Sequence, residues 1–317
     1  MNPNLPIGRF APTPSGRMHL GNVLCGLLAW LSAHSQHGTM VLRIEDLDPD
    51  RCPRSYALQL QEDLRWLGLT WEEGGDSPGP HSPYYQSERT QLYQRALDCL
   101  KEKGLLYPCF CSRAQLHAAQ APHLSDGNYL YPGTCRSLSS REIQEKSLHR
   151  SPAIRIAVPQ LTIRFDDLLY GPQQEELSTQ CGDFILRRSD GVFAYQLAVV
   201  VDDALMGVTQ VVRGRDLLSS TARQIWLHSL LDWEPPQFGH IPLLLAPDGT
   251  RLSKRDRALD LGVLRQKYSS GQLLGELAAL CGLLERPEAV TAGELIPLFS
   301  WDKLPKEDLY LPAHFWQ

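Results

Sequence analysis

Two strand–helix pairs follow one another at the start of the chain, and this order restricts the fold more than any other feature. A short apolar strand near residues 7–10 leads through a turn rich in proline and glycine into a helix that ends at Gly38. A second strand at Met40–Ile44 leads to a helix over about 54–67, which Gly68 ends. Glycine is favoured just past a helix because it adopts positive φ. This order predicts a parallel sheet covered by helices.

The regular alternation of strand and helix stops near residue 105 and returns near residue 181. Residues 105–180 combine cysteines, Pro-Gly and short strand-like pieces, which predict an inserted α+β module. Apolar runs at Phe184–Leu186, Phe193–Val201 and Val208–Val212 predict the second half of the sheet. We therefore expect an α/β fold with a doubly wound parallel (Rossmann-like) sheet that is split by the insertion. The expected parts are the first half of this domain at 1–104, the insertion at 105–180, the second half at 181–240, and a loop with a short C-terminal helical region at 241–317.

The composition is that of an ordinary soluble globular protein, with 43% hydrophobic and 21% charged residues in 317. No apolar run is long enough for a membrane span, and the N-terminus lacks a signal-peptide pattern, so we expect no membrane partner and a cytoplasmic location. Eight cysteines then predict reduced thiols, some of them on a metal. The net charge of −5 does not exclude nucleic acid, because only the local field of a basic stripe meets the phosphates.

Two short segments far apart in the chain predict a split nucleotide site. His19 and Gly21 stand where the Pro/Gly-rich turn enters the first helix, and the free N–H groups of a helix N-terminus attract phosphate. In the second segment, Lys254 supplies a cation for charge that develops on a triphosphate. The first pattern alone is typical of a turn, and the second of a solvated loop. Their combination predicts ATP contacts, with His19 and Lys254 as the catalytic candidates.

Charged side chains at the expected strand ends predict a small acidic ligand. Ligands of a doubly wound sheet bind at the carboxyl ends of the strands, where Arg9, Glu45 and Arg213 fall. Guanidinium groups grip carboxylates in a bidentate manner, and Glu45 can accept an ammonium group. Tyr195 adds a hydroxyl, although a lone tyrosine in such a run is more typical of the core.

Three cysteines in the insertion are the metal candidates. Cys109, Cys111 and Cys135, with a fourth ligand close by, fit a tetrahedral zinc site. Three buried free thiols are the alternative. The remaining five cysteines are interpreted as packing residues: Cys25, Cys52, Cys99, Cys181 and Cys281.

Seven segments, in their order along the chain, resemble a known family. They are RFAPTPSG, RIEDLDP, YYQSER, YPCFC, DFILRRSDGVFAYQLAVVVDD, GVTQVVRGRDLL and RLSK. The set resembles the glutamyl-tRNA synthetase group of the class I aminoacyl-tRNA synthetases, with Asn22 in place of the second histidine of the HIGH signature, and with Arg251 and Arg255 as departures from KMSKS. About sixty residues follow Lys254, too few for the anticodon-binding region of that group. The shorter form, with Asp216-Leu217-Leu218, is similar to the glutamyl-queuosine tRNA(Asp) synthetases, which carry only the catalytic half.

The resemblance implies a two-step reaction in which L-glutamate is activated with ATP and Mg²⁺ and then transferred to queuosine in the anticodon of tRNA(Asp). It implies that ATP is held by His19, Gly21 and Lys254. It implies that glutamate is held by Arg9, Phe10, Ala11, Pro12, Thr13, Glu45, Tyr195 and Arg213. It also implies one structural Zn²⁺ on Cys109, Cys111 and Cys135. Tyr131 matches the family spacing for the fourth ligand, and His117 and His123 are alternatives.

Three other interpretations stay open on the sequence. A truncated synthetase would charge the 3′ end of a tRNA. A catalytically dead tRNA-binding module would bind without reacting, although the set Arg9, Glu45, Tyr195 and Arg213 argues against it. A nucleotidyltransferase would use a similar phosphate site on a small molecule, although the cysteine-bearing insertion argues against it.

Overall fold

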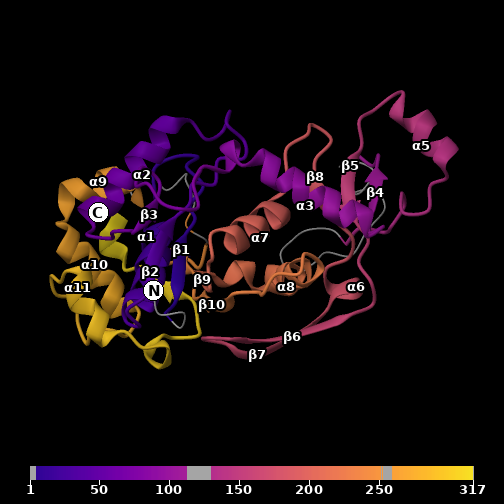
Figure 1. Cartoon of the computed structure of the whole chain (residues 1–317). Helices are drawn as coiled ribbons and strands as arrows, with labels where there is room; N and C mark the ends of the chain where they lie inside the picture. The colour runs from indigo at the N-terminus through magenta and orange to yellow at the C-terminus, as the bar shows by residue number, and fades with distance from the viewer. Residues whose placement is uncertain (1–4, 113–129, 251, 253–258, 317) are drawn as a thin grey trace.

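The computed structural model describes residues 5–112, 130–250, 252 and 259–316 (Figure 1). Its largest sheet has seven strands in the order β3-β2-β1-β9-β10-β6-β7. Neighbouring strands are parallel except β6 and β7, which are antiparallel. The expected α/β fold with a mostly parallel sheet is therefore confirmed. The strands are β1 (Ile7–Phe10), β2 (Thr39–Leu42), β3 (Glu73–Gly74), β6 (Thr162–Asp167), β7 (Gly171–Glu176), β9 (Gln210–Gly214) and β10 (Gln237–Ile241).

The first half of the chain follows the predicted alternation. Helix α1 (Leu20–His34) follows β1, helix α2 (Arg54–Trp66) follows β2, and helix α3 (Thr90–Glu102) comes later. β1 pairs with β2 on one side and with β9 on the other, where Gly8 lies opposite Gln210. The strand that opens the chain is thus an inner strand, and it joins two segments that are far apart in sequence.

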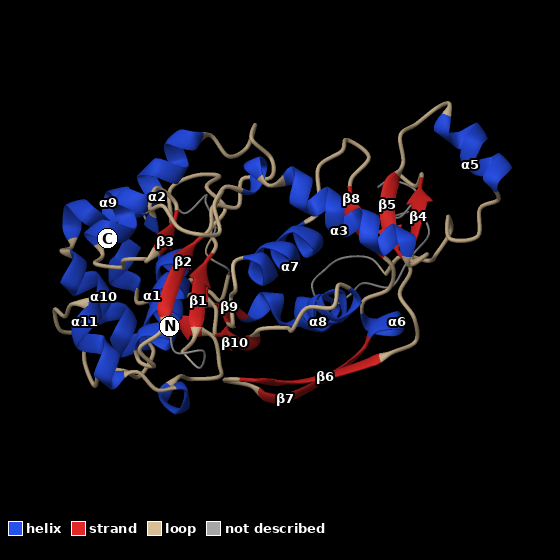
Figure 2. Ribbon diagram, viewed as in Figure 1, coloured by secondary structure: helices blue, strands red, loops and turns tan. Residues whose placement is uncertain are grey.

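Helices form hydrophobic cores on the two sides of this sheet. α1 and α2 pack with the C-terminal helices around one core, and Figure 2 shows the C-terminal helices grouped beside α1 and α2. α3 packs with the two central helices around the other core. No described helix is both long enough and apolar enough to cross a membrane. The remaining helices of the two cores are α7 (Tyr195–Leu205), α8 (Thr221–Leu230), α9 (Leu261–Lys267), α10 (Ser270–Leu280) and α11 (Ala292–Leu295).

A three-stranded antiparallel sheet lies at the far end of α3 from the main sheet (Figure 1). It consists of β4 (Leu106–Cys109), β5 (Ala153–Ile156) and β8 (Phe184–Arg187). The same part of the chain contains α5 (Ser140–Ser147) and α6 (Leu177–Gln180). A short parallel pair, β11 (Leu244–Leu245) and β12 (Leu309–Tyr310), joins the middle of the chain to its C-terminal region.

Two of the three apolar runs predicted for the second half of the sheet lie elsewhere. Phe184–Leu186 belongs to β8 and pairs with β5. Most of Phe193–Val201 is in α7, which is buried almost all round. A helix buried on every side has no polar stripe, so its apolar run cannot be told from a strand by periodicity. Conversely, β6 and β7 come from the expected insertion but extend the edge of the main sheet.

Candidate active site

Ten of the residues singled out from the sequence line one cavity with a volume of about 580 Å³. The cavity lies at the carboxyl ends of β1 and β9, beside the N-terminus of α1. Lys254 lies outside the described residues, and Leu252, two positions before it, lines the cavity. The ten residues brought together are Arg9, Phe10, Ala11, Pro12, Thr13, His19, Gly21, Glu45, Tyr195 and Arg213.

His19 is the N-cap of α1 and takes part in a capping box. Its Nδ1 accepts the N–H of Gly21 at 3.1 Å, and the Asn22 side chain accepts the N–H of His19 at 3.3 Å. Because Nδ1 is an acceptor, the proton of the neutral ring is on Nε2. Asn22 stands where the signature has its second histidine, and here its side chain completes the capping box by accepting the N–H of His19. An imidazole N–H and a helix N-terminus together favour phosphate.

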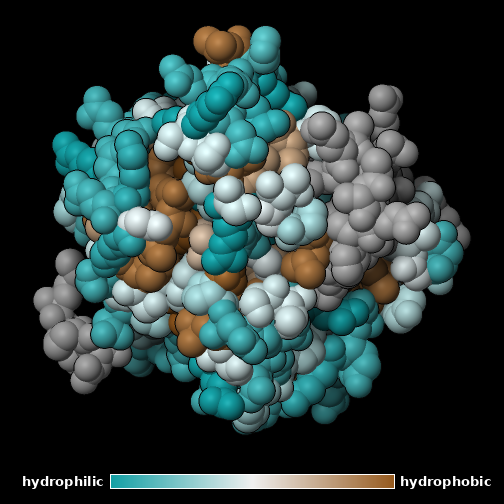
Figure 3. Space-filling model, turned by 90° about the vertical axis from the view of Figure 1, so that its right-hand side faces the viewer, coloured by the Kyte–Doolittle hydropathy of each residue, from teal (hydrophilic) through white to brown (hydrophobic). Residues whose placement is uncertain are grey.

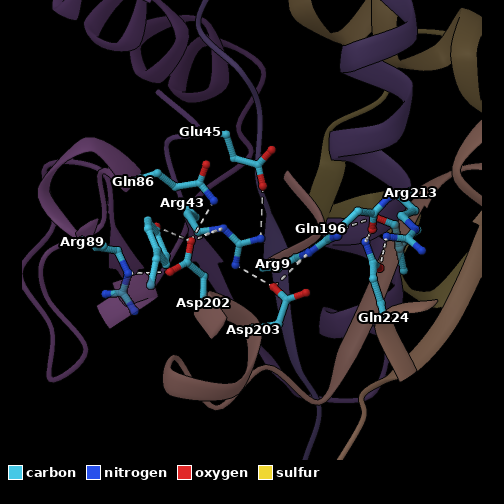
Figure 4. Close-up of polar contacts among 12 residues, drawn as sticks. Arg9, Arg43, Glu45, Gln86, Arg89, Gln196, Asp202, Asp203, Arg213 and Gln224 are labelled. Carbon is cyan, nitrogen blue, oxygen red and sulfur yellow. Dashed lines mark hydrogen bonds and ion pairs between the residues drawn. The ribbon is translucent and has the colours of Figure 1, made fainter. Parts of the chain in front are cut away.

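A buried ionic network lies behind Arg9 (Figure 4). Its centre is Arg43, which is fully buried. The guanidinium of Arg43 lies 2.6 Å from Asp203 Oδ1, 3.2 Å from Glu45 Oε1 and 3.7 Å from Asp202 Oδ2. Arg9 Nε lies 3.6 Å from the same oxygen of Asp203, and Arg9 Nη1 donates to the carbonyl of Val212 at 3.0 Å. The cavity residue Arg9 is therefore held in place from the core.

Asp202 anchors the other end of this network. Its carboxylate accepts from Arg89 Nε at 2.6 Å, Gln86 Nε2 at 2.8 Å and the Tyr93 hydroxyl at 2.9 Å. Three donors, together with Arg43, satisfy a carboxylate that has no access to water. Charges of both signs thus alternate from Arg89 to Arg9, and each charge of this network has an opposite charge beside it.

Glu45 joins this network to the cavity. Burial raises the pKa of Glu45 above its ordinary value, and the neighbouring Arg43 and Arg9 oppose that rise. A carboxylate that has lost its water gains from another cation at close range. The position and surroundings of Glu45 therefore suit a ligand with an ammonium group.

Arg213 is surrounded by neutral acceptors. It donates to His240 Nε2 at 3.0 Å, Gln224 Oε1 at 2.7 Å, Thr221 Oγ1 at 2.9 Å and the Leu217 carbonyl at 3.3 Å. No carboxylate among the described residues forms an ion pair with it. Burial lowers the pKa of Arg213. Because most of its N–H groups are used within the protein, a full bidentate grip by Arg213 alone is not available to a ligand.

A buried histidine–aspartate pair, His240 and Asp167, lies next to Arg213 and helps to orient it. His240 Nδ1 lies 2.6 Å from Asp167 Oδ2, and both side chains are fully buried. Since His240 Nε2 accepts from Arg213, its proton is on Nδ1 and is donated to Asp167. Burial lowers the pKa of His240 to about 4, helped by the charge of Arg213 and opposed by the hydrogen bond to Asp167. At pH 7 the His240 ring is therefore uncharged, and it lies between the guanidinium of Arg213 and the carboxylate of Asp167.

These supporting residues were not among the predicted site residues. His240 and Asp167 lie on β10 and β6, 73 positions apart, and nothing in either segment alone points to the other. Asp202 and Asp203 do carry a signal, because two adjacent carboxylates close an apolar run of valines. Charges inside such a run need buried partners.

The three candidate metal ligands of the insertion lie together. The Sγ atoms of Cys109, Cys111 and Cys135 are all within 4.8 Å of one another. The Tyr131 hydroxyl lies 3.4 Å from Cys109 Sγ and 3.5 Å from Cys111 Sγ, and Cys111 and Cys135 are 3.6 Å apart. Ideal tetrahedral zinc ligands, with bonds of about 2.3 Å to sulfur and about 2.0 Å to oxygen, are separated by roughly 3.5–3.8 Å. The four side chains fit such an ion.

Tyr131 is well placed among these thiols. Its ring packs under the Arg155 guanidinium, which is 3.8 Å from the ring centroid, and its hydroxyl accepts the N–H of Cys135 at 2.9 Å. The alternatives His117 and His123 lie outside the described residues. Among the residues that the structure describes, these three cysteines are the cluster suited to a metal ion.

Comparison with known proteins agrees with this geometry. The family described as "tRNA synthetases class I (E and Q), catalytic domain" matches residues 7–297. Two proteins named glutamyl-Q tRNA(Asp) synthetase are similar over 96% of the chain, one from Symbiobacterium thermophilum (52% identity, 96% of its length) and one from Nitratidesulfovibrio vulgaris (49%, 95% of its length). The crystal structure of a glutamate tRNA ligase from Elizabethkingia meningosepticum in complex with its amino acid has a TM-score of 0.83 at 27% identity, covering 99% of this chain and 68% of that one. The chain therefore belongs to the class I tRNA synthetases (E and Q), through their catalytic domain.

Proposed function

We propose that the protein activates L-glutamate with ATP and transfers it to queuosine in tRNA(Asp). The observation that carries the proposal is the single cavity that holds Arg9, Glu45, Tyr195 and Arg213 together with His19. Glutamate has one ammonium group and two carboxylates, and this cavity has a carboxylate, Glu45, that is only 10% exposed, together with two buried arginines. The choice of acceptor rests on the relatives named glutamyl-Q tRNA(Asp) synthetase, which the chain matches over nearly their whole length.

Glutamate binding assigns a separate task to each charged group. Glu45 meets the ammonium group, while Arg9 and Arg213 each offer part of a guanidinium to the side-chain carboxylate. Tyr195, at the start of α7, adds a hydroxyl beside Arg213. The α-carboxylate remains free and faces the nucleotide, as the reaction requires.

Activation needs positioning and charge stabilisation, and no side-chain nucleophile. An oxygen of the α-carboxylate attacks the α-phosphorus of ATP, and the bond from that phosphorus to the bridging oxygen of pyrophosphate breaks. His19 donates from Nε2 to the phosphates, and Gly21 lets the nucleotide approach the start of α1. Lys254 meets the charge that grows on the phosphate oxygens, and Mg²⁺ bound with ATP would supply further positive charge there.

The same proposal includes a structural zinc ion in the insertion. Cys109, Cys111, Cys135 and Tyr131 would hold it, and the ion would supply cross-linking of β4 to the segment 131–135 rather than reactivity. Metal analysis of protein never exposed to chelator should find about one zinc per chain. Tyr131→Phe should release the metal more readily than His117→Ala or His123→Ala, and the reverse order would move the fourth ligand to a histidine.

One experiment tests the proposed reaction. ATP–pyrophosphate exchange with glutamate should proceed without tRNA, since residues of this chain form the lining of the cavity. Transfer is then measured to an anticodon stem-loop of tRNA(Asp) that ends in a 3′-phosphate and carries queuosine or guanosine. Glutamate should enter only the queuosine form, and prior periodate cleavage of the cyclopentenediol should abolish acceptance. Charging of unmodified full-length tRNA at its 3′ end would instead favour an acceptor-end synthetase.

A further inference from the structure

A buried carboxylate on α2, Asp63, lies next to the wall of the cavity and has no role in the reaction proposed above. Its side chain has no exposed surface. Asp63 Oδ2 accepts from Arg17 Nε at 3.0 Å, and Oδ1 accepts from Arg17 Nη2 at 2.8 Å and from Arg265 Nη1 at 2.7 Å. Two parallel hydrogen bonds from one guanidinium fix its plane. Arg17 itself lines the cavity, two positions before His19.

Asp63 is an unusual residue for its place on the helix. It shares the buried face of α2 with Leu60 and Leu64. A charge on such a face is costly to bury unless it is paired. Its two partners, Arg17 and Arg265, keep 26% and 31% of their side chains exposed. The carboxylate is therefore the fixed member of this group, and it determines where the two guanidinium groups lie.

The start of α9 is attached to the turn that leads from β1 to α1. The Leu261 N–H donates to the Met18 carbonyl in that turn at 3.0 Å. Asp260 caps α9 by accepting the Gly262 N–H at 2.7 Å, and its Oδ1 lies 3.9 Å from Arg17 Nε. A Cβ at Gly262 would lie 2.1 Å from Arg17 Nη1, so the guanidinium approaches the backbone of α9 closely. Arg17 thus packs between α2 and the first turn of α9.

This group lies where the two segments proposed to act on ATP meet. His19 forms an isolated β-bridge with Asp260, which follows the segment that carries Lys254. The two arginines of the group are matched by two aspartates, so Arg17 is not a further cation for phosphate. Asp63 does not line the cavity. An effect of Asp63 on a ligand must therefore act through the position of its neighbours.

We propose that Asp63 is a positioning residue for the nucleotide, an inference that rests on the proposed function. Through Arg17 it holds the turn that presents His19 Nε2 to the phosphates, and through Arg265 it keeps α9 against that turn. The glutamate residues have a separate support in the ionic network around Arg43. Loss of Asp63 therefore weakens the binding of ATP and leaves the binding of glutamate nearly unchanged.

Pyrophosphate exchange with varied ATP and varied glutamate tests this division. Asp63→Asn keeps the shape of the side chain but removes its charge and one acceptor. The KM for ATP should rise about tenfold, because hydrogen bonds between charged groups are lost, while the KM for glutamate stays within about twofold. Arg17→Met should also raise the KM for ATP. Adding Asp63→Asn to Arg17→Met should raise it by less than about twofold further, since the two residues act as one unit.

A milder variant keeps the test decisive where Asp63→Asn does not fold. Arg265→Gln changes the partly exposed end of the group and leaves the pair of Asp63 and Arg17 in place. It should raise the KM for ATP about threefold and leave the KM for glutamate unchanged.

Two controls make the same change of arginine to glutamine elsewhere. Arg65→Gln, also on α2, removes an exposed arginine from its ion pair with Asp76 and should change neither KM. Arg141→Gln lies on α5, at the other end of the molecule from α2 and α9 (Figure 1), and should also change neither. That side of the molecule is mainly hydrophilic, and its hydrophobic residues form separate small areas (Figure 3), so the substitution uncovers no large apolar surface.

Equal rises of the two KM values, or an unchanged KM for ATP in the variants that fold, would overturn the positioning role. Calorimetric binding of ATP with Mg²⁺, in the absence of glutamate, separates this result from a failure of the proposed function. If the wild-type protein exchanges no pyrophosphate but binds ATP more tightly than Arg265→Gln does, the proposed function is overturned and the role of Asp63 stands. Equal binding of ATP to wild type, Arg265→Gln and Arg65→Gln would overturn the role of Asp63.

Discussion

Arg43 and Arg213 are both buried arginines at the same site, and their partners differ in kind. Arg43 is surrounded by the carboxylates of Asp202, Asp203 and Glu45. Arg213 is surrounded by an imidazole, an amide, a hydroxyl and a carbonyl, all of them neutral at pH 7. Both guanidinium groups are therefore oriented, but of the two only Arg43 has carboxylate partners in the part of the chain that the structure describes.

The difference separates a structural cation, Arg43, from the cation that we propose to bind the ligand, Arg213. Burying a charge is costly unless it is paired, so Arg43 with its carboxylates belongs to the folded core. The neutral acceptors of Arg213 fix the orientation of its guanidinium plane but do not neutralise its positive charge. That charge is then available to an anionic ligand. His240 makes this possible, because its ring is hydrogen-bonded to both Asp167 and Arg213. Asp167 therefore helps to orient Arg213 without its carboxylate touching the guanidinium.

The largest expected effect is on stability at Arg43. Arg43→Met leaves buried carboxylates without their common partner and should lower the free energy of unfolding by about 3–5 kcal/mol. Arg213→Met leaves no carboxylate unpaired and should lower it by less than half as much. Urea denaturation measures both, and Arg141→Met on the exposed face of α5 should change it by less than about 0.5 kcal/mol. Equal losses at the two buried arginines would remove the distinction.

The next effect is the pH dependence contributed by His240. Its pKa is about 4 in the folded chain and about 6.5 when unfolded, so its contribution to stability is complete above pH 6.5 and is lost as pH falls to about 4. At about 1.4 kcal/mol for each pKa unit, the loss is roughly 3 kcal/mol. His228, whose pKa is also lowered by burial, acts in the same direction. Unfolding of wild type and His240→Asn between pH 7 and 4 therefore isolates the His240 contribution as a difference in slope, and identical slopes would contradict it.

A smaller effect is expected on the choice of amino acid. Arg213→Gln replaces the unneutralised cation by a neutral amide and should lower kcat/KM for glutamate in exchange by about 10- to 100-fold, since a hydrogen bond to a charged group contributes about 1.5–3 kcal/mol. Glutamine should gain relative to glutamate. Arg188→Gln, which removes an exposed arginine from a surface ion pair, serves as the control. Retention of full glutamate preference by Arg213→Gln would assign the carboxylate to Arg9 alone.

The smallest expected effect comes from removing one of the two hydrogen bonds of His240 at a time. His240→Asn keeps a donor for Asp167 but removes the acceptor for Arg213, whereas His240→Gln offers an acceptor where Nε2 stood. The KM for glutamate should rise about tenfold in His240→Asn and return most of the way in His240→Gln, with kcat changing less in both. Exchange assays at saturating ATP measure the split. A larger effect on kcat than on KM would show that His240 acts on the reaction rather than on binding.

The sequence predicted the parts of this site that follow from strand order. Arg9 and Arg213 fall at the ends of β1 and β9, and adjacent parallel strands bring such ends together. His19 was found for the same kind of reason, because a helix start is a local feature with a recognisable cap. The capping pattern of a helix start and the meeting of parallel strand ends were sufficient to predict that these residues lie at one site.

The second layer of the site follows from tertiary packing, which the sequence pattern does not encode. The partners of Arg213 come from β10, α8 and the 3-10 segment before it, and Asp167 comes from a strand that was expected in a separate module. α7 was missed as a helix because it is apolar on all sides, yet it supplies both aspartates of the network. Charges in an apolar segment indicate buried partners, but they do not identify them.

The place of β1 between β2 and β9 also determines the order in which the chain can fold during synthesis. β9 begins at Gln210, about 170 residues after β2 ends, and at ~5–20 residues per second the ribosome needs on the order of 10–30 s to make the chain between them. Throughout that interval one edge of β1 has no neighbouring strand, and the Asp202 and Asp203 partners of Arg43 have not yet been synthesised. A nascent chain that pauses before α7 therefore exposes one edge of β1, and its Arg43 has Glu45 but lacks its two aspartate partners. Unpaired strand edges of this kind are prone to wrong pairing and aggregation.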